Sequence, residues 1–71
     1  LLEKNQETEL LLKAIRRISA DRQQLILLKF LEDLSNAEIA QIMGRSEGAI
    51  KSLYHRALLA LREEMEIIRD H

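Results

Sequence analysis

The sequence has no proline, cysteine or tryptophan, and glycine occurs only at Gly44 and Gly48. It also has one phenylalanine, one tyrosine, one threonine and no valine, although strands favour β-branched and aromatic residues and tight turns favour glycine. These absences argue against an all-β or α/β domain. The lack of cysteine excludes disulfides and thiolate zinc sites. No apolar run approaches the roughly 18 residues of a membrane helix, and no signal-peptide pattern is visible.

The composition is that of one small globular domain, with 71 residues, 46% hydrophobic and 32% charged. The formal net charge is only −1, but the charges are unevenly distributed. Residues 45–62 contain four basic residues and one acidic residue, whereas residues 63–71 contain four acidic residues and one basic residue. We expect residues 1–71 to form a single domain. Because the chain begins with Leu1 rather than Met, we also expect it to be a fragment of a longer protein.

Apolar residues recur at helical spacing and predict an all-α fold, a small four-helix domain. The helices are expected at about residues 8–18, 22–32, 36–43 and 47–68. Ser35 and Glu38 have the spacing of a capping box, Gly44 suits a left-handed helix end, and Ser46 can cap the last helix. The second helix has more apolar residues than one face can hold. Either it is buried on most sides, or part of its apolar surface binds a partner.

The last two helices have the spacing of a helix-turn-helix. The small residue Ala40 lies where the two backbones must approach, and Gly44 follows four positions later, where the turn needs a positive φ. Apolar residues flank both points, at Ile39 and Ile50 among others. An ordinary αα-hairpin is the alternative. In a helix-turn-helix, the second helix presents its first turns to the major groove of DNA.

The candidate DNA-binding residues lie opposite the apolar face of this second helix. They are Arg45, Ser46, Glu47, Gly48, Lys51, Ser52, His55 and Arg56. Lys51, Ser52 and His55 are spaced to reach base edges or backbone oxygens from one side of the helix.

The remaining candidates suit the phosphate backbone. Ser46 and the first free amides of the helix can bind a phosphate, and Arg45 and Arg56 can neutralise phosphates. Glu47 either accepts from a cytosine amino group or favours the helix dipole, and we favour the dipole. Arg62 is expected to pair with the acidic residues beside it.

Segments 34–40, 43–52, 55–57 and 61–62 resemble region four of bacterial sigma factors, closest to the extracytoplasmic-function type. The resemblance covers roughly residues 10–62. It implies that the recognition helix reads the promoter's minus-35 element, with Lys51, Ser52 and His55 nearest the bases. Two departures reduce the positive charge or polarity of this face: many relatives have a basic residue at the position of Leu53 and a threonine at that of Ala49.

The resemblance also implies protein partners. Region four docks on the β flap of core RNA polymerase, and the apolar residues Leu27, Phe30 and Leu31 suit the flap or an anti-sigma factor, although core packing explains them equally well. The implied partners are therefore double-stranded promoter DNA, core RNA polymerase and an anti-sigma factor, in the cytoplasm, with no membrane and no small-molecule substrate.

Two other functions remain open from the sequence: the helix-turn-helix of a response regulator, and a sigma-like module that binds an anti-sigma factor without reading DNA. An enzyme is not expected. Ser52 and His55 lie within one helical turn, but on an exposed face without an orienting carboxylate. The two histidines lack clustered ligands, so we expect neither a metal site nor a cofactor.

Overall fold

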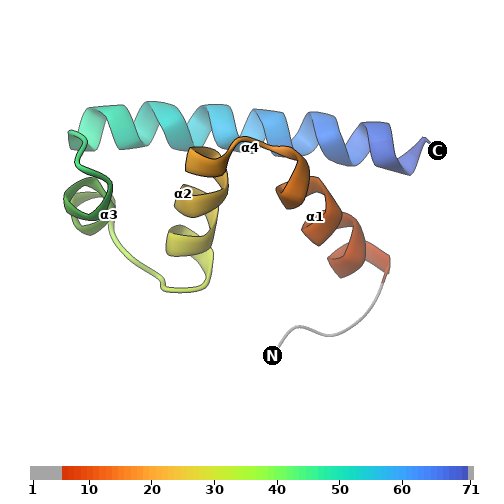
Figure 1. Cartoon of the computed structure of the whole chain (residues 1–71), viewed down its shortest axis with the longest axis horizontal. Helices are drawn as coiled ribbons and strands as arrows, with labels where there is room; N and C mark the ends of the chain where they lie inside the picture. The colour runs from red at the N-terminus through yellow and green to blue at the C-terminus, as the bar shows by residue number, and fades with distance from the viewer. Residues whose placement is uncertain (1–5, 71) are drawn as a thin grey trace.

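The computed structural model describes residues 6–70, which contain four α-helices and no strand. The helices are α1 (Gln6–Arg17), α2 (Ala20–Phe30), α3 (Asn36–Met43) and α4 (Glu47–Arg69). The predicted all-α class is confirmed. Leu1, from which a longer protein was inferred, lies outside the described residues. The long helix α4 runs along one side of the molecule, and α1, α2 and α3 all pack against it (Figure 1).

Helix α3 begins and ends where the sequence predicts, because both of its ends are specified locally. The Ser35 hydroxyl accepts a hydrogen bond from the Glu38 N–H at 3.2 Å, and the Glu38 carboxylate accepts one from the Ser35 N–H at 3.0 Å. At the other end Gly44 adopts φ 65°, and the N–H groups of Gly44 and Arg45 both donate to the carbonyl of Ala40.

Helix α2 differs from the expected residues 22–32 at both ends. Ser19 is its N-cap, so the helix begins at Ala20 and Asp21 lies in its first turn. It ends at Phe30 because Asp33 adopts a left-handed conformation with φ 53°. Aspartate tolerates this conformation better than most residues, so the chain turns here without a glycine. Helix α1 begins two residues before the expected start and ends one residue early, and α4 continues one residue past its expected end.

The core consists of two apolar clusters, and α4 contributes to both. The first contains Ala14, Ile18, Ile26, Ala57 and Leu61, and the second contains Leu25, Ile39, Ala40, Ile50 and Leu53. Tyr54 packs against both clusters. The neighbouring residues Leu25 and Ile26 of α2 therefore face different clusters. Because burial of apolar surface is the main stabilising term in folding, α4 is the common support of the domain.

The apolar residues of α2 that one buried face cannot hold lie on an exposed surface. Leu25 and Ile26 are buried, whereas Leu27, Phe30 and Leu31 are 40%, 61% and 65% exposed. Core packing therefore does not account for these three side chains.

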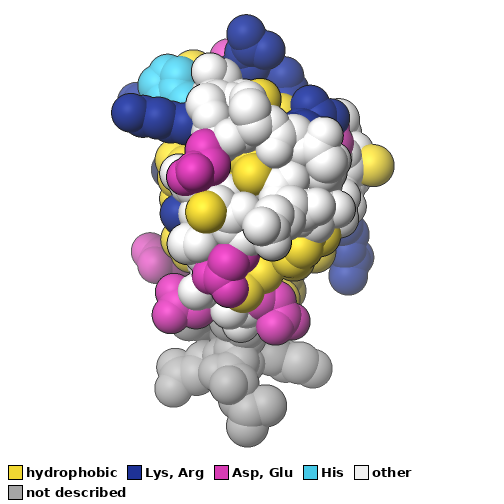
Figure 2. All heavy atoms as spheres, turned by 90° about the vertical axis from the view of Figure 1, so that its left-hand side faces the viewer, with side chains coloured by type: hydrophobic (Ala, Val, Ile, Leu, Met, Phe, Trp, Pro, Cys, Tyr) yellow, Lys and Arg dark blue, Asp and Glu magenta, His cyan; other side chains and the backbone are white. Residues whose placement is uncertain are grey.

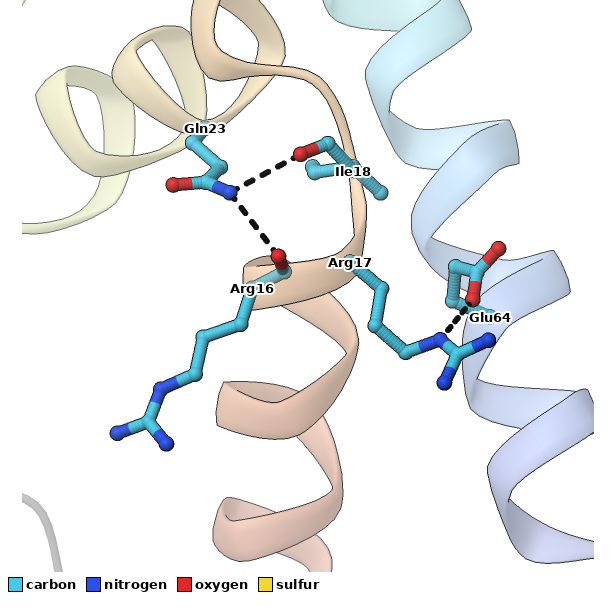
Figure 3. A network of polar contacts seen from close by, with 5 residues as sticks. All are labelled: Arg16, Arg17, Ile18, Gln23 and Glu64. Atoms are coloured by element: carbon cyan, nitrogen blue, oxygen red, sulfur yellow. Dashed lines mark hydrogen bonds and ion pairs between the residues drawn. The ribbon is translucent and has the colours of Figure 1, made fainter.

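Polar contacts fix the corner between α1 and α2 (Figure 3). The side-chain amide of Gln23 donates to the carbonyl oxygens of Arg16 and Ile18, at 3.3 and 3.0 Å. The Arg17 guanidinium pairs with the Glu64 carboxylate of α4. The two Gln23 hydrogen bonds satisfy carbonyl groups at the end of α1, which have no partner within that helix, and the ion pair joins α1 to α4.

Candidate nucleic-acid interface

Helices α3 and α4 form the predicted helix-turn-helix. Ile39 and Ile50 are fully buried where the two helices meet, and Ala40 is buried beside them. A larger residue at position 40 would hold the helices apart, because interiors of proteins are close-packed. The buried crossing leaves the opposite side of α4 directed to solvent.

All eight candidate DNA-binding residues are exposed on this side or in the turn that precedes α4. The Ser46 hydroxyl accepts a hydrogen bond from the Ala49 N–H at 3.1 Å, so this side chain caps α4 as expected. The first N–H groups of a helix have no intrahelical acceptor and carry the positive end of its dipole. This end of α4 therefore offers backbone donors to an anion.

Lys51, Ser52, His55 and Arg56 line one shallow surface over the first turns of α4. Within residues 6–70, neither Lys51 nor Arg56 forms an ion pair, so both charges are available to a ligand. Figure 2 looks at the end of the molecule where α4 begins. Basic side chains and a histidine lie towards the top of this face, and acidic side chains lie mostly towards the bottom. Basic charge therefore predominates on the upper part of this face, although an acidic side chain lies beside it.

Two arginines near this surface have carboxylate partners. Arg62 pairs with Glu66 at 3.6 Å, which confirms the pairing expected from the sequence. Arg45 Nη2 lies 3.4 Å from Asp21 Oδ2, a contact that the sequence analysis missed. Arg45 and Asp21 are 24 residues apart and belong to different elements, so no local pattern signals their contact.

Two positions depart from the pattern of many relatives, and the structure accounts for one of them. Leu53 is only 8% exposed and packs in the second core cluster, so it adds apolar burial and no charge to the interface. Ala49 is exposed, and its small side chain makes no polar contact. Glu47 occupies the first turn of α4, where its charge favours the helix dipole.

A second surface lies between α1 and α2, where an apolar groove of about 300 Å³ opens to solvent. The predicted partner-binding residues Leu27, Phe30 and Leu31 line one side of it. Helix α1 supplies Leu11, Leu12 and Ile15, which the sequence analysis did not assign to this surface. The run of leucines at positions 10–12 was a usable signal, because one helix face cannot bury three consecutive residues.

Other kinds of site find no support in the part of the chain that the structure describes. Residues 6–70 contain no group of three or more histidine, aspartate or glutamate side chains arranged to hold a metal ion. None of the helices described is both long enough and apolar enough to cross a membrane.

Comparisons of the sequence with known proteins agree on one family. Residues 8–61 match the family described as "Sigma-70, region 4". The chain is 49% identical over 51 residues to the ECF RNA polymerase sigma factor BldN of Streptomyces coelicolor, covering 72% of this chain and 19% of that protein. It is 33% identical over 57 residues to the ECF RNA polymerase sigma factor SigX of Bacillus subtilis, covering 80% of this chain and 29% of that protein.

A solved structure agrees with these sequence matches. It is described as the 1.8 Å structure of the RsbN–BldN complex, and it matches with a TM-score of 0.77 and 43% identity over 82% of this chain and 42% of the other. The chain spans less than half the length of the curated relatives it matches. A sigma factor is not an enzyme, in agreement with the sequence analysis. The chain belongs to the sigma-70 region 4 family, as a domain of the extracytoplasmic-function type of RNA polymerase sigma factor.

Proposed function

We propose that this domain, as part of a longer cytoplasmic protein, recognises the minus-35 element of promoters in transcription initiation. The observation that carries the proposal is the basic surface on the first turns of α4, where Lys51 and Arg56 have no ion pair among residues 6–70 and a buried helix crossing supports the helix from behind. A recognition helix of this kind enters the major groove with its N-terminal residues towards the bases.

The roles of the side chains follow from their places on α4. Lys51, Ser52 and His55 reach base edges: lysine donates to guanine acceptors, and serine and histidine donate or accept. Arg56 and the first amides of α4, beside Ser46, bind phosphates and fix the register of the helix on the duplex. Glu47 stabilises the helix and makes no base contact.

Replacement of Lys51 by alanine tests this assignment. The side chain is exposed and forms no ion pair among the described residues, so Lys51→Ala is expected to leave the melting temperature unchanged. It should weaken binding to a minus-35 duplex by about 1–3 kcal/mol if the lysine reads a base. The measurement is fluorescence anisotropy with a labelled promoter duplex.

Lys13→Ala is the matched control, because Lys13 is an exposed lysine of α1, away from the helix-turn-helix. Equal affinities of wild type and Lys51→Ala would contradict the role of Lys51. Equal losses in both variants would show that only net charge matters.

A second proposed activity is docking of the apolar groove on a protein partner, namely the β flap of core RNA polymerase. The groove is lined mainly by α1 and α2, with Leu61 from the middle of α4, whereas the DNA-binding surface lies on the first turns of α4, so one domain can use both at once. The groove is also the surface that an anti-sigma factor would cover. If the domain bound such a factor and no DNA, it would act through the groove and not through the first turns of α4.

A substitution in the groove distinguishes binding to the polymerase from binding to DNA. Leu31 is 65% exposed, so Leu31→Ser should keep the domain folded while it weakens binding to purified core RNA polymerase. Ile67→Ser is the control, because Ile67 is an exposed apolar residue of α4 outside the groove. DNA binding by the isolated chain should be the same in both variants. Unchanged polymerase binding by Leu31→Ser would contradict docking through the groove.

A further inference from the structure

The contact between Asp21 and Arg45 joins the start of α2 to the turn of the helix-turn-helix. Arg45 Nη2 and Asp21 Oδ2 are 3.4 Å apart, and the two side chains are 43% and 41% exposed. An exposed pair of this kind contributes little to stability, because water and salt screen it. Because the pair lies beside the recognition helix, it also affects the charge that Arg45 presents to DNA.

Asp21 is the fixed member of the pair. Its Oδ1 atom accepts hydrogen bonds from the Ser19 hydroxyl at 2.8 Å and from the Arg22 N–H at 2.9 Å. The Ser19 hydrogen bond, with smaller contributions from the Arg22 N–H and the charge of Arg45, lowers the pKa of the Asp21 carboxyl. Asp21 is therefore ionised at neutral pH, and its second oxygen points to Arg45.

Arg45 is the member that can change partner. It follows Gly44 directly in the turn, and Ser46, the cap of α4, comes next. A phosphate bound at the start of α4 would lie within reach of its long side chain. The guanidinium has five N–H donors, but a unit charge already neutralised by a carboxylate attracts a phosphate less strongly than a free one.

We propose that Asp21 is a built-in counter-ion of Arg45, which Arg45 exchanges for a DNA phosphate on binding, so that Asp21 weakens the general attraction of the domain for DNA. This inference rests on the proposed function. A free arginine that neutralises a phosphate releases a condensed cation from DNA, which makes affinity depend on salt. When Arg45 leaves Asp21, the freed carboxylate attracts a cation from solution, which offsets the cation that the DNA releases.

Asp21→Asn removes the charge and keeps the Oδ1 acceptor that binds Ser19 and Arg22. At low salt the variant should bind a promoter duplex about two- to fivefold more tightly, the factor equivalent to an exposed ion pair. The slope of log K against log salt should become steeper by about one, because the cation that Arg45 releases from DNA is no longer offset by one taken up at Asp21. Anisotropy titrations at several salt concentrations measure both quantities.

Two further variants separate this mechanism from a simple change of charge. In an Arg45→Ala background, Asp21→Asn should no longer steepen the salt dependence, because no arginine is freed. Glu38→Gln removes a carboxylate at the start of α3, where its hydrogen bonds are to Ser35 and it has no ion pair among the described residues. It should leave the slope unchanged.

The binding results can overturn the counter-ion role of Asp21 without overturning the DNA-reading role of the domain. If the wild type binds and Lys51→Ala weakens binding, but Asp21→Asn binds no more tightly, the counter-ion role is wrong and the DNA-reading role stands. The same conclusion follows if Asp21→Asn steepens the slope equally with and without Arg45. If neither wild type nor Asp21→Asn binds duplex DNA at low salt, both are overturned.

Discussion

At the scale of single residues, Gly44 and Gly48 lie four positions apart but face different constraints. A Cβ atom at either position would meet no heavy atom within 4 Å. Only Gly44 has a positive φ, at 65°. Gly44→Ala should therefore destabilise the domain by about 1–2 kcal/mol through backbone conformation alone. Each kcal/mol lowers the melting temperature of a domain of this size by about 4–8 °C. An unchanged melting temperature would contradict the left-handed turn.

Gly48→Ala is expected to act in the opposite direction on stability. Gly48 lies in the first turn of α4 with open space around it, and alanine favours helix more than glycine by up to about 1 kcal/mol. The same methyl group would stand between the backbone and a bound phosphate. We expect a higher melting temperature and weaker DNA binding, measured on the same sample. Unchanged DNA affinity would mean that the phosphate does not approach this turn.

At the scale of helices, the capping box of α3 makes stability depend on pH. The N–H and hydroxyl of Ser35 lower the pKa of the Glu38 carboxyl below its ordinary value of 4.5. A carboxyl whose pKa is lower in the folded state stabilises the fold above its ordinary pKa, and this stabilisation is lost as the pH falls through the folded value.

Thermal unfolding of wild type and Glu38→Gln from pH 7 downwards checks this dependence. At neutral pH the wild type should be the more stable. The difference should shrink as the pH falls below 4.5, where Glu38 becomes protonated and resembles glutamine. A difference that stays constant across this range would contradict a charged capping box.

Both ends of α3 and the C-terminal end of α2 show how far the sequence predicts the fold. Local signals at Ser35 and Gly44 define α3 to the residue, because each acts within four positions of a helix end. The end of α2 depends on Asp33, whose left-handed backbone is not the commonest choice for that residue type, so the sequence analysis extended the helix too far. The exposed face of α4 was predicted because helical spacing alone decides which side its core residues occupy.

At the scale of the whole molecule, the features that the sequence did not reveal are contacts between elements. The groove requires α1 and α2 to diverge below α4, and the pairing of Arg45 with Asp21 requires the turn to fold against α2 (Figure 1). Both depend on how helices pack, whereas spacing along the chain reports one helix at a time. The candidate DNA surface was therefore predictable residue by residue, but its charge balance was not.

This charge balance predicts a shallow salt dependence. Of the four basic residues between positions 45 and 62, Arg45 and Arg62 have carboxylate partners, and Lys51 and Arg56 have none among the described residues. With these two unpaired charges held against the duplex, Lys51 at the base edges and Arg56 at a phosphate, log K should fall with log salt at a slope of about −2. A slope of about −4 would show that all four charges act on the DNA and that their carboxylates do not matter.

The most direct test of the central claim is an amide chemical-shift titration of the 71-residue chain with promoter duplexes at low salt. It detects weak binding and reports the response of each residue. If α4 reads DNA, salt-sensitive shifts will be concentrated in residues 45–56, with small changes around the groove. A folded spectrum without shifts in residues 45–56 would contradict the DNA-reading role and leave the groove as the working surface of the domain.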